Sequence, residues 1–153
     1  MKTSIENSPR SVQGAGGLSH RAVRPIRTFL AEDSPLLMRL LAGILSKHQR
    51  VFIVGSAPDG GKALHNTSTL QPDLVLMDLH MPGLDGAEAT RILKQRPNPP
   101  IICVVTSNDT PEARTRCRAA GADAFVVKAG NLAARLLSVI EEFFPDDLNQ
   151  NEA

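Results

Sequence analysis

Residues 74–86 read Leu-Val-Leu-Met-Asp-Leu-His-Met-Pro-Gly-Leu-Asp-Gly, and this stretch decides the fold class. Four successive apolar residues, 74–77, predict a strand that is buried on both faces, as in a parallel sheet. The run ends directly at an acid, Asp78. Residues 85–95 then place Ala89, Ile92 and Leu93 on one side of a predicted helix that ends before Pro97. A buried strand that ends in an acid and leads into a helix is a unit of an α/β fold.

The same unit recurs on both sides of this stretch. Short apolar runs rich in Val and Ile predict strands at 26–31, 51–56, 74–77, 101–105 and 124–127. Helical spacing and start signals, such as Ser34-Pro35 and Thr110-Pro111, predict helices at 34–48, 59–70, 85–95, 110–121 and 131–144. The order is (βα) repeated five times, which predicts an α/β doubly wound, five-stranded parallel sheet.

One domain, residues 25–145, accounts for this pattern. Residues 1–24 show no period of 2 or 3.6 and are expected to form a flexible N-terminal tail. Residues 146–153 are expected to form a flexible C-terminal tail. With 42% apolar residues, the chain has enough hydrophobic material for a core.

Composition excludes several classes of function. The net charge of +1 provides no overall field to attract DNA or anionic lipid, and Trp and Tyr are absent, which argues against a base-stacking surface. Cys103 and Cys117 form no Cys-x-x-Cys pair, so a reducing compartment fits best. No apolar run is long enough to span a bilayer, and none near the N-terminus resembles a signal peptide. A cytoplasmic protein without membrane or nucleic-acid partners is expected.

Polar functional groups follow four of the five predicted strands. Glu32 and Asp33 come after the first strand, Asp78 after the third, Thr106 after the fourth and Lys128 after the fifth. In open parallel sheets, ligand sites lie beyond the carboxyl ends of the strands. Each residue alone has an ordinary interpretation as a loop acid, a capping hydroxyl or a surface lysine. Their joint placement at one sheet edge indicates a site.

The chemistry of such a site favours phosphoryl transfer. Three neighbouring carboxylates repel one another unless a cation joins them, and hard oxygen ligands suit Mg²⁺, with Mn²⁺ as an alternative. The four histidines show no spacing typical of zinc ligands: His20, His48, His65 and His80. A metal, an ammonium and a hydroxyl together stabilise a transferring phosphoryl group, and Asp78 is the candidate nucleophile.

Four segments resemble the receiver domain of two-component response regulators, the CheY-like family. They are Phe29-Leu-Ala-Glu-Asp33, residues 75–86, Val104-Val-Thr-Ser107 and Gly121-Ala-Asp-Ala-Phe-Val-Val-Lys128. The resemblance covers roughly residues 26–144, and the set is far more specific than any one piece. It implies a flavodoxin-like sheet with strand order 2-1-3-4-5.

The resemblance also implies a role for each matching residue. Asp78 would accept a phosphoryl group from a sensor histidine kinase or a histidine phosphotransfer protein. Metal ligation would involve Asp33, Asp78, the backbone carbonyl of His80 and, mainly through water, Glu32. Lys128 would pair with the phosphate, Thr106 and Phe125 would form the switch, and His80 and Asn108 would tune phosphate lifetime. The surface formed by residues 110–121, 124–127 and 131–144 would contact a downstream protein, an output domain or a second copy.

Three departures from the family's pattern stand out. Glu32 replaces the more frequent Asp, and Phe125 replaces a Tyr, which removes a hydroxyl. Ala129 follows Lys128 where proline is frequent, so no cis peptide is expected there.

Two rival functions stay open from the sequence. One is a receiver-like interaction module that signals without phosphorylation, and the other is a phosphatase that uses Asp78 as nucleophile. In such phosphatases a second acid commonly lies two residues after the nucleophile, where this chain has His80. Few residues follow Phe144, so direct DNA binding by this chain is not expected, and the receiver is either stand-alone or part of a longer protein.

Arg114, Arg116 and Arg118 alternate along one predicted helix. They are either a solvated face or a contact for an acidic partner.

Overall fold

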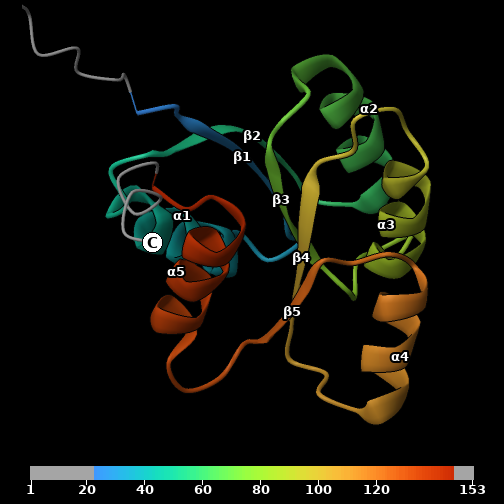
Figure 1. Cartoon of the computed structure of the whole chain (residues 1–153). Coiled ribbons are helices and arrows are strands. Elements are labelled where there is room, and N and C mark those ends of the chain that lie inside the picture. The colour runs from blue at the N-terminus through green and yellow to red at the C-terminus, as the bar shows by residue number, and fades with distance from the viewer. Residues whose placement is uncertain (1–22, 147–153) are drawn as a thin grey trace, which may run out of the picture.

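The computed structural model describes residues 23–146, and its elements alternate strand and helix throughout (Figure 1). The strands are β1 (Ile26–Ala31), β2 (Val51–Ala57), β3 (Leu74–Asp78), β4 (Ile101–Thr106) and β5 (Ala124–Val127). All five predicted strands are present, and three of them extend one residue further than predicted. The predicted tails, residues 1–24 and 146–153, lie almost wholly outside the described residues.

The strands form one parallel sheet in the order β2-β1-β3-β4-β5. This confirms the predicted fold class and strand order. The order reverses direction at β1, because the chain first adds β2 on one side of β1 and then β3 on the other. The carboxyl ends of β1 and β3 are therefore neighbours, and a ligand site is expected between them.

The helices are α1 (Pro35–Ser46), α2 (Gly60–Leu70), α3 (Gly86–Lys94), α4 (Pro111–Ala119) and α5 (Leu132–Phe143). Four of them start at a side chain that accepts a hydrogen bond from a backbone N–H of the first turn, as capping requires. These caps are Ser34, Asp59, Asp85 and Thr110. The predicted helices are confirmed, with ends that move by one or two residues.

Two layers of helices cover the sheet. Figure 1 shows α1 and α5 on one face and α2, α3 and α4 on the other. The core under α1 and α5 includes Leu30, Leu41, Leu76 and Ile140, and the core under α2 and α3 includes Phe29, Met77 and Leu93. A third cluster, which includes Leu79 and Cys117, lies between α3 and α4. Successive strand residues thus enter opposite cores, which explains the uninterrupted apolar runs.

The edge strands differ from this pattern. β1, β3 and β4 are almost entirely buried, but β2 is an edge strand on which Phe52 is 55% and Ile53 is 39% exposed. The prediction of strands buried on both faces therefore holds for the three inner strands only. An apolar run in the sequence does not distinguish an inner strand from an edge strand, because the pairing order sets which strand lies outside.

Within residues 23–146 none of the peptide bonds is cis, and the bond between Lys128 and Ala129 is trans, as expected. No helix in the same part of the chain is both long enough and apolar enough to span a bilayer.

Candidate phosphoryl-acceptor site

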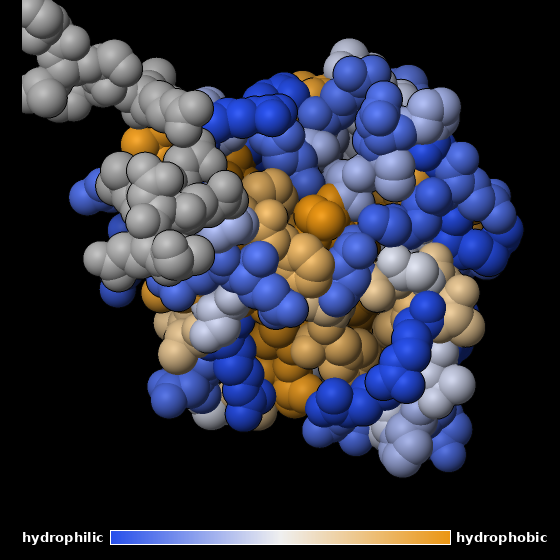
Figure 2. All heavy atoms as spheres, viewed as in Figure 1, coloured by the Kyte–Doolittle hydropathy of each residue, from blue (hydrophilic) through white to orange (hydrophobic). Residues whose placement is uncertain are grey.

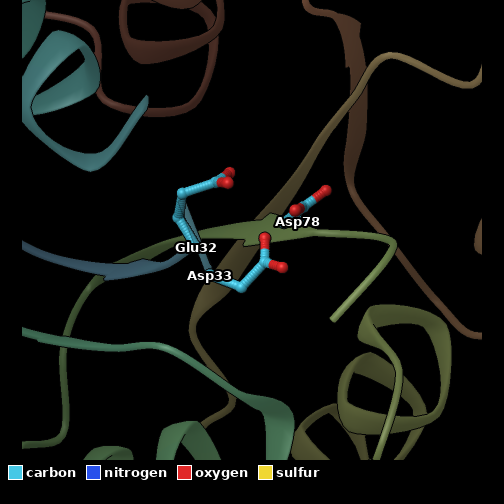
Figure 3. Close-up of side chains that lie close together, drawn as sticks. All are labelled: Glu32, Asp33 and Asp78. Atoms are coloured by element: carbon cyan, nitrogen blue, oxygen red, sulfur yellow. The ribbon is translucent and has the colours of Figure 1, made fainter. Parts of the chain in front are cut away.

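Three carboxylates meet beyond the carboxyl ends of β1 and β3. Glu32, Asp33 and Asp78 each offer an oxygen that lies within 4.8 Å of the other two. Figure 3 shows the three side chains turned toward a common space, Glu32 and Asp33 from the end of β1 and Asp78 from the end of β3. Asp33 is exposed, whereas Glu32 and Asp78 are only 2% and 6% exposed. Asp78, which the sequence singled out as the nucleophile, is thus one of two buried acids at the ends of inner strands.

Lys128 brings the only described ammonium group to this cluster. Its Nζ lies 2.7 Å from Oε2 of Glu32 and 3.2 Å from Oδ1 of Asp78. The side chain is 9% exposed, so it is not a surface lysine. The backbone holds it in place, because the N–H of Lys128 donates to the carbonyl of Thr106 at 2.8 Å. One cation thus bridges two buried carboxylates that come from different strands.

The charges at this site are not balanced. Burial raises the pKa of the Asp78 carboxyl, and Lys128 offsets only part of that rise. Burial likewise raises the pKa of Glu32, again against the lowering effect of the Lys128 hydrogen bond and with a further rise from the Asp78 charge. Two buried acids with raised pKa values share one ammonium. The site therefore has an excess of negative charge, which a further cation would relieve.

The backbone at Gly86 approaches the backbone at Asp78 closely. A Cβ placed on Gly86 would lie 1.9 Å from the carbonyl oxygen of Asp78, so only glycine fits there. The N–H of Gly86 donates to the carbonyl of Leu79 at 2.9 Å, which closes the turn between β3 and α3. Asp85 then caps α3. This packing explains why the stretch of residues 74–86 carries glycine at its end.

Thr106, His80 and Asn108 form a polar rim beside the carboxylates. Thr106 is fully buried, and its Oγ1 accepts a hydrogen bond from the N–H of Asn108 at 3.1 Å. Nδ2 of Asn108 lies 3.1 Å from Nε2 of His80, which joins the loop after β4 to the loop after β3. The two residues predicted to tune phosphate lifetime are thus in direct contact, a link that the sequence did not reveal.

Phe125 lies further from the acids and has a partner that the sequence did not predict. The ring is half-buried on β5, and Cζ of Arg114 lies 4.8 Å from its centroid. Nε of Arg114 also donates to Oδ1 of Asp109 at 2.6 Å, and Arg116 pairs with Asp85. Two of the three arginines on α4 are therefore exposed but paired with acids of neighbouring loops, so they are not a freely solvated face. Alternation by two residues places them on different sides of the helix, which gave no signal for these contacts.

The carboxylates fit a divalent cation such as Mg²⁺. They are hard oxygen donors, they lie close enough to share one ion, and the exposed Asp33 leaves room for water and for phosphate oxygens. In the described part of the chain, no cluster that includes His or Cys is spaced to hold a metal. The donor set therefore favours Mg²⁺ over zinc.

Residues 28–141 match the profile of the response regulator receiver domain. The chain is 37% identical over 112 residues to a protein-glutamate methylesterase/protein-glutamine glutaminase from Symbiobacterium thermophilum, and this covers 72% of the chain and 31% of that protein. A similar protein from Anaeromyxobacter dehalogenans is 41% identical over 100 residues, 65% of the chain and 29% of its own length. The chain thus spans about a third of the length of these relatives.

Solved structures give the same answer for the fold. The response regulator domain of Thermotoga maritima CheB superposes with a TM-score of 0.72 at 26% identity and covers 79% of this chain and 97% of its own. A two-component response regulator of the LuxR family from Aurantimonas superposes with a TM-score of 0.74 at 28% identity, over 78% of this chain and 85% of its own.

Proposed function

This chain belongs to the response regulator receiver family of two-component systems, and from that premise we propose that Asp78 accepts a phosphoryl group from a phosphohistidine. The observation that carries the proposal is the pairing of a buried acid with a lysine, since Nζ of Lys128 lies 3.2 Å from Oδ1 of Asp78. A carboxylate oxygen of Asp78 forms the new O–P bond while the P–N bond of the donor breaks and its electron pair returns to the imidazole. The product is an acyl phosphate.

Residues around Asp78 supply the positive charge that this step requires. Lys128 moves from a carboxylate partner to a phosphoryl oxygen as charge develops there. Asp33, Asp78 and the carbonyl of His80 would hold Mg²⁺, or Mn²⁺, with Glu32 acting through water. When bound there, the cation would supply positive charge to phosphoryl oxygens and to the surplus carboxylates.

The donor docks beside the site, on α1. Leu36 is 75% and Leu40 is 49% exposed, and they lie one turn apart on the helix that starts directly after Asp33. Exposed leucines at this spacing suit an apolar helix face of a partner, such as a sensor histidine kinase or a histidine phosphotransfer protein. Leu40→Ser should slow transfer from a protein donor and leave the reaction with acetyl phosphate unchanged.

Thr106 and Phe125 link phosphorylation of Asp78 to a change at the molecular surface. Thr106 turns toward the new phosphate, and Phe125 moves inward into the space beside it. Figure 2 shows an apolar surface between α5 and α4, where β5 carries the half-buried Ala124, Phe125 and Val127. We propose that this α4–β5–α5 surface contacts a downstream protein, an output domain or a second copy.

Mass spectrometry of the intact protein tests the proposal. Treatment with acetyl phosphate and Mg²⁺ should add one phosphoryl group to the wild type and none to Asp78→Asn. Asp73→Asn, which changes an acid at the other end of the same strand, should still gain the group. Absence of an adduct on the wild type would favour a receiver-like module that does not depend on phosphorylation.

We do not expect this chain to act as a phosphatase on small substrates. Phosphatases with an aspartate nucleophile commonly carry a second carboxylic acid two residues after it as general acid, and this chain has His80 there. We therefore expect no release of phosphate from monoesters above a Asp78→Asn control. The cytoplasmic location and the domain limits 25–145 likewise stay predictions.

A further inference from the structure

The three arginines of α4 have unequal surroundings. Arg116 pairs with Asp85, and Arg114 pairs with Asp109 while its guanidinium lies over the Phe125 ring. Arg118 forms no ion pair and no side-chain hydrogen bond with any residue from 23 to 146. Arg114 is the arginine that joins three segments: α4, the loop after β4, and β5.

Phe125, whose ring lies beneath Arg114, is on the strand next to that of Thr106, at the edge of the acidic site. In the β4–β5 register, Phe125 is opposite Val104, and Thr106 is two residues further along β4 on the same sheet face. Thr106 is fully buried, and its Oγ1 is held by the N–H of Asn108. In the proposed switch, the ring moves inward when that hydroxyl turns toward the phosphate. A ring that moves inward also leaves the guanidinium.

We propose that Arg114 is a positioning residue that holds Phe125 in its half-buried position and so opposes the phosphorylated conformation. The proposal rests on the proposed function, because it concerns how phosphorylation of Asp78 is coupled to the surface. The contact between guanidinium and ring exists in one conformation only, and it biases the equilibrium by its full strength. Asp109 keeps the guanidinium in place over the ring.

Beryllofluoride with Mg²⁺ is the probe of the phosphorylated conformation. Cation–π contacts at exposed positions are worth about 0.5–1 kcal/mol, so Arg114→Ala should bind beryllofluoride about two- to fivefold more tightly than the wild type. Asp109→Asn should show a smaller gain, and Arg114→Lys should return toward the wild-type affinity because it keeps a cation. Arg118→Ala is the matched control on the same helix and should leave the affinity unchanged. An Arg114→Ala affinity equal to or weaker than that of Arg118→Ala overturns the proposal.

A second measurement needs no adduct. Fluorine-labelled phenylalanine, with the Phe125 resonance assigned through Phe125→Leu, reports on the ring in the resting protein. Arg114→Ala should shift this resonance, and Arg118→Ala should not; equal spectra for the two variants overturn the proposal. If the wild type takes up no beryllofluoride while the resonance still shifts, the proposed function fails and the contact of Arg114 with the ring stands.

Discussion

The acids at the two ends of the parallel sheet differ in how many donors and cations surround them. At the amino end, Asp123 accepts hydrogen bonds from Nζ of Lys94 and from the N–H of Ile102, both at 2.8 Å. Asp73 accepts from the N–H of Arg27 at 2.9 Å. At the carboxyl end, Glu32 and Asp78 share the ammonium of Lys128, and Asp33 lies beside them without a contact to it. Acids with dedicated donors stabilise the fold, whereas acids left short of positive charge hold a place for a ligand.

A hollow also lies at the amino end of the sheet, away from the acidic site, and Asp73 is among its lining residues. It has a volume of about 570 Å³, and Arg96, Pro99, Ile101 and Phe144 are among the residues that line it. Arg96 is already used there, because it donates to the carbonyl of Leu64 at 3.0 Å. This hollow is therefore not where the surplus negative charge lies, and a cavity by itself would have pointed to the wrong end of the sheet.

The largest difference between the two ends should appear in phosphorylation. Asp33→Asn removes an exposed carboxylate from the acidic cluster, and the rate of phosphoryl uptake from acetyl phosphate should fall by about 100-fold. Asp73→Asn removes an acid at the amino end and should change this rate less than twofold. The rate is measured by intact mass over time with Mg²⁺, and addition of EDTA should bring the wild type down to the Asp33→Asn level. Equal losses in both variants would contradict the comparison.

For the free energy of unfolding, the larger loss should come from an acid at the amino end of the sheet. Asp123→Ala leaves the Lys94 ammonium and the Ile102 N–H without their acceptor, and it should lower the free energy of unfolding by about 2 kcal/mol. Urea unfolding followed by circular dichroism measures this loss. Phosphoryl uptake by the folded fraction should stay at the wild-type rate, since the substitution lies at the other end of the sheet.

Removing a charge from the acidic site should stabilise the protein without metal. The folded-state pKa of Asp78 is raised above its ordinary value of 3.8, so the folded state favours the protonated carboxyl. The stability from that protonation is present below the ordinary value and is lost as pH rises through the folded-state pKa. At neutral pH, Asp78→Asn should therefore be more stable than the wild type by about 1 kcal/mol in EDTA.

The raised pKa of Asp78 also predicts how the stability gain of Asp78→Asn depends on pH. The difference between Asp78→Asn and the wild type should shrink as pH falls toward the ordinary value of 3.8, because the wild-type carboxyl is then neutral in both states. Thermal unfolding at a series of pH values in EDTA measures it. A difference that grows toward acid pH would mean that Lys128 compensates the ionised Asp78 fully.

The smallest effect concerns the rim of the acidic site. His80→Ala and Asn108→Ala each remove one side of the contact between Nε2 of His80 and Nδ2 of Asn108. If the two residues act together on phosphate lifetime, their effects on the dephosphorylation rate should be non-additive by about twofold. A double-mutant cycle of rates, each followed by loss of the phosphoryl mass, measures this coupling. Effects that multiply would show that the two residues act separately.

Local patterns in the sequence were enough to predict the elements. Continuous apolar runs between helical segments gave the five strands, and Ser34, Asp85 and Thr110 were recognisable as helix starts because capping depends on neighbours in the chain. The edge position of β2, with its exposed Phe52, was not predictable in this way. Pairing order depends on contacts between distant segments.

The acidic cluster was also predictable in outline. Parallel strands place their carboxyl ends at one edge, so residues that follow the strands had to come near one another. The individual partners were not predictable: the bridge from Lys128 to Glu32 spans 96 residues, and Arg114 of α4 reaches Phe125 of β5. Such contacts depend on side-chain packing that no local pattern encodes.

The sequence by itself determined the alternation of strands and helices, the acids and the lysine at the strand ends, and membership of the candidate family. Only the tertiary structure decided which carboxylates Lys128 neutralises, that His80 and Asn108 touch, and that Arg114 covers Phe125. The physical reason is the separation in sequence between the groups that interact. Strand and helix preferences arise between residues a few positions apart, whereas the charge balance of a buried site depends on groups that folding alone brings within a few ångströms of one another.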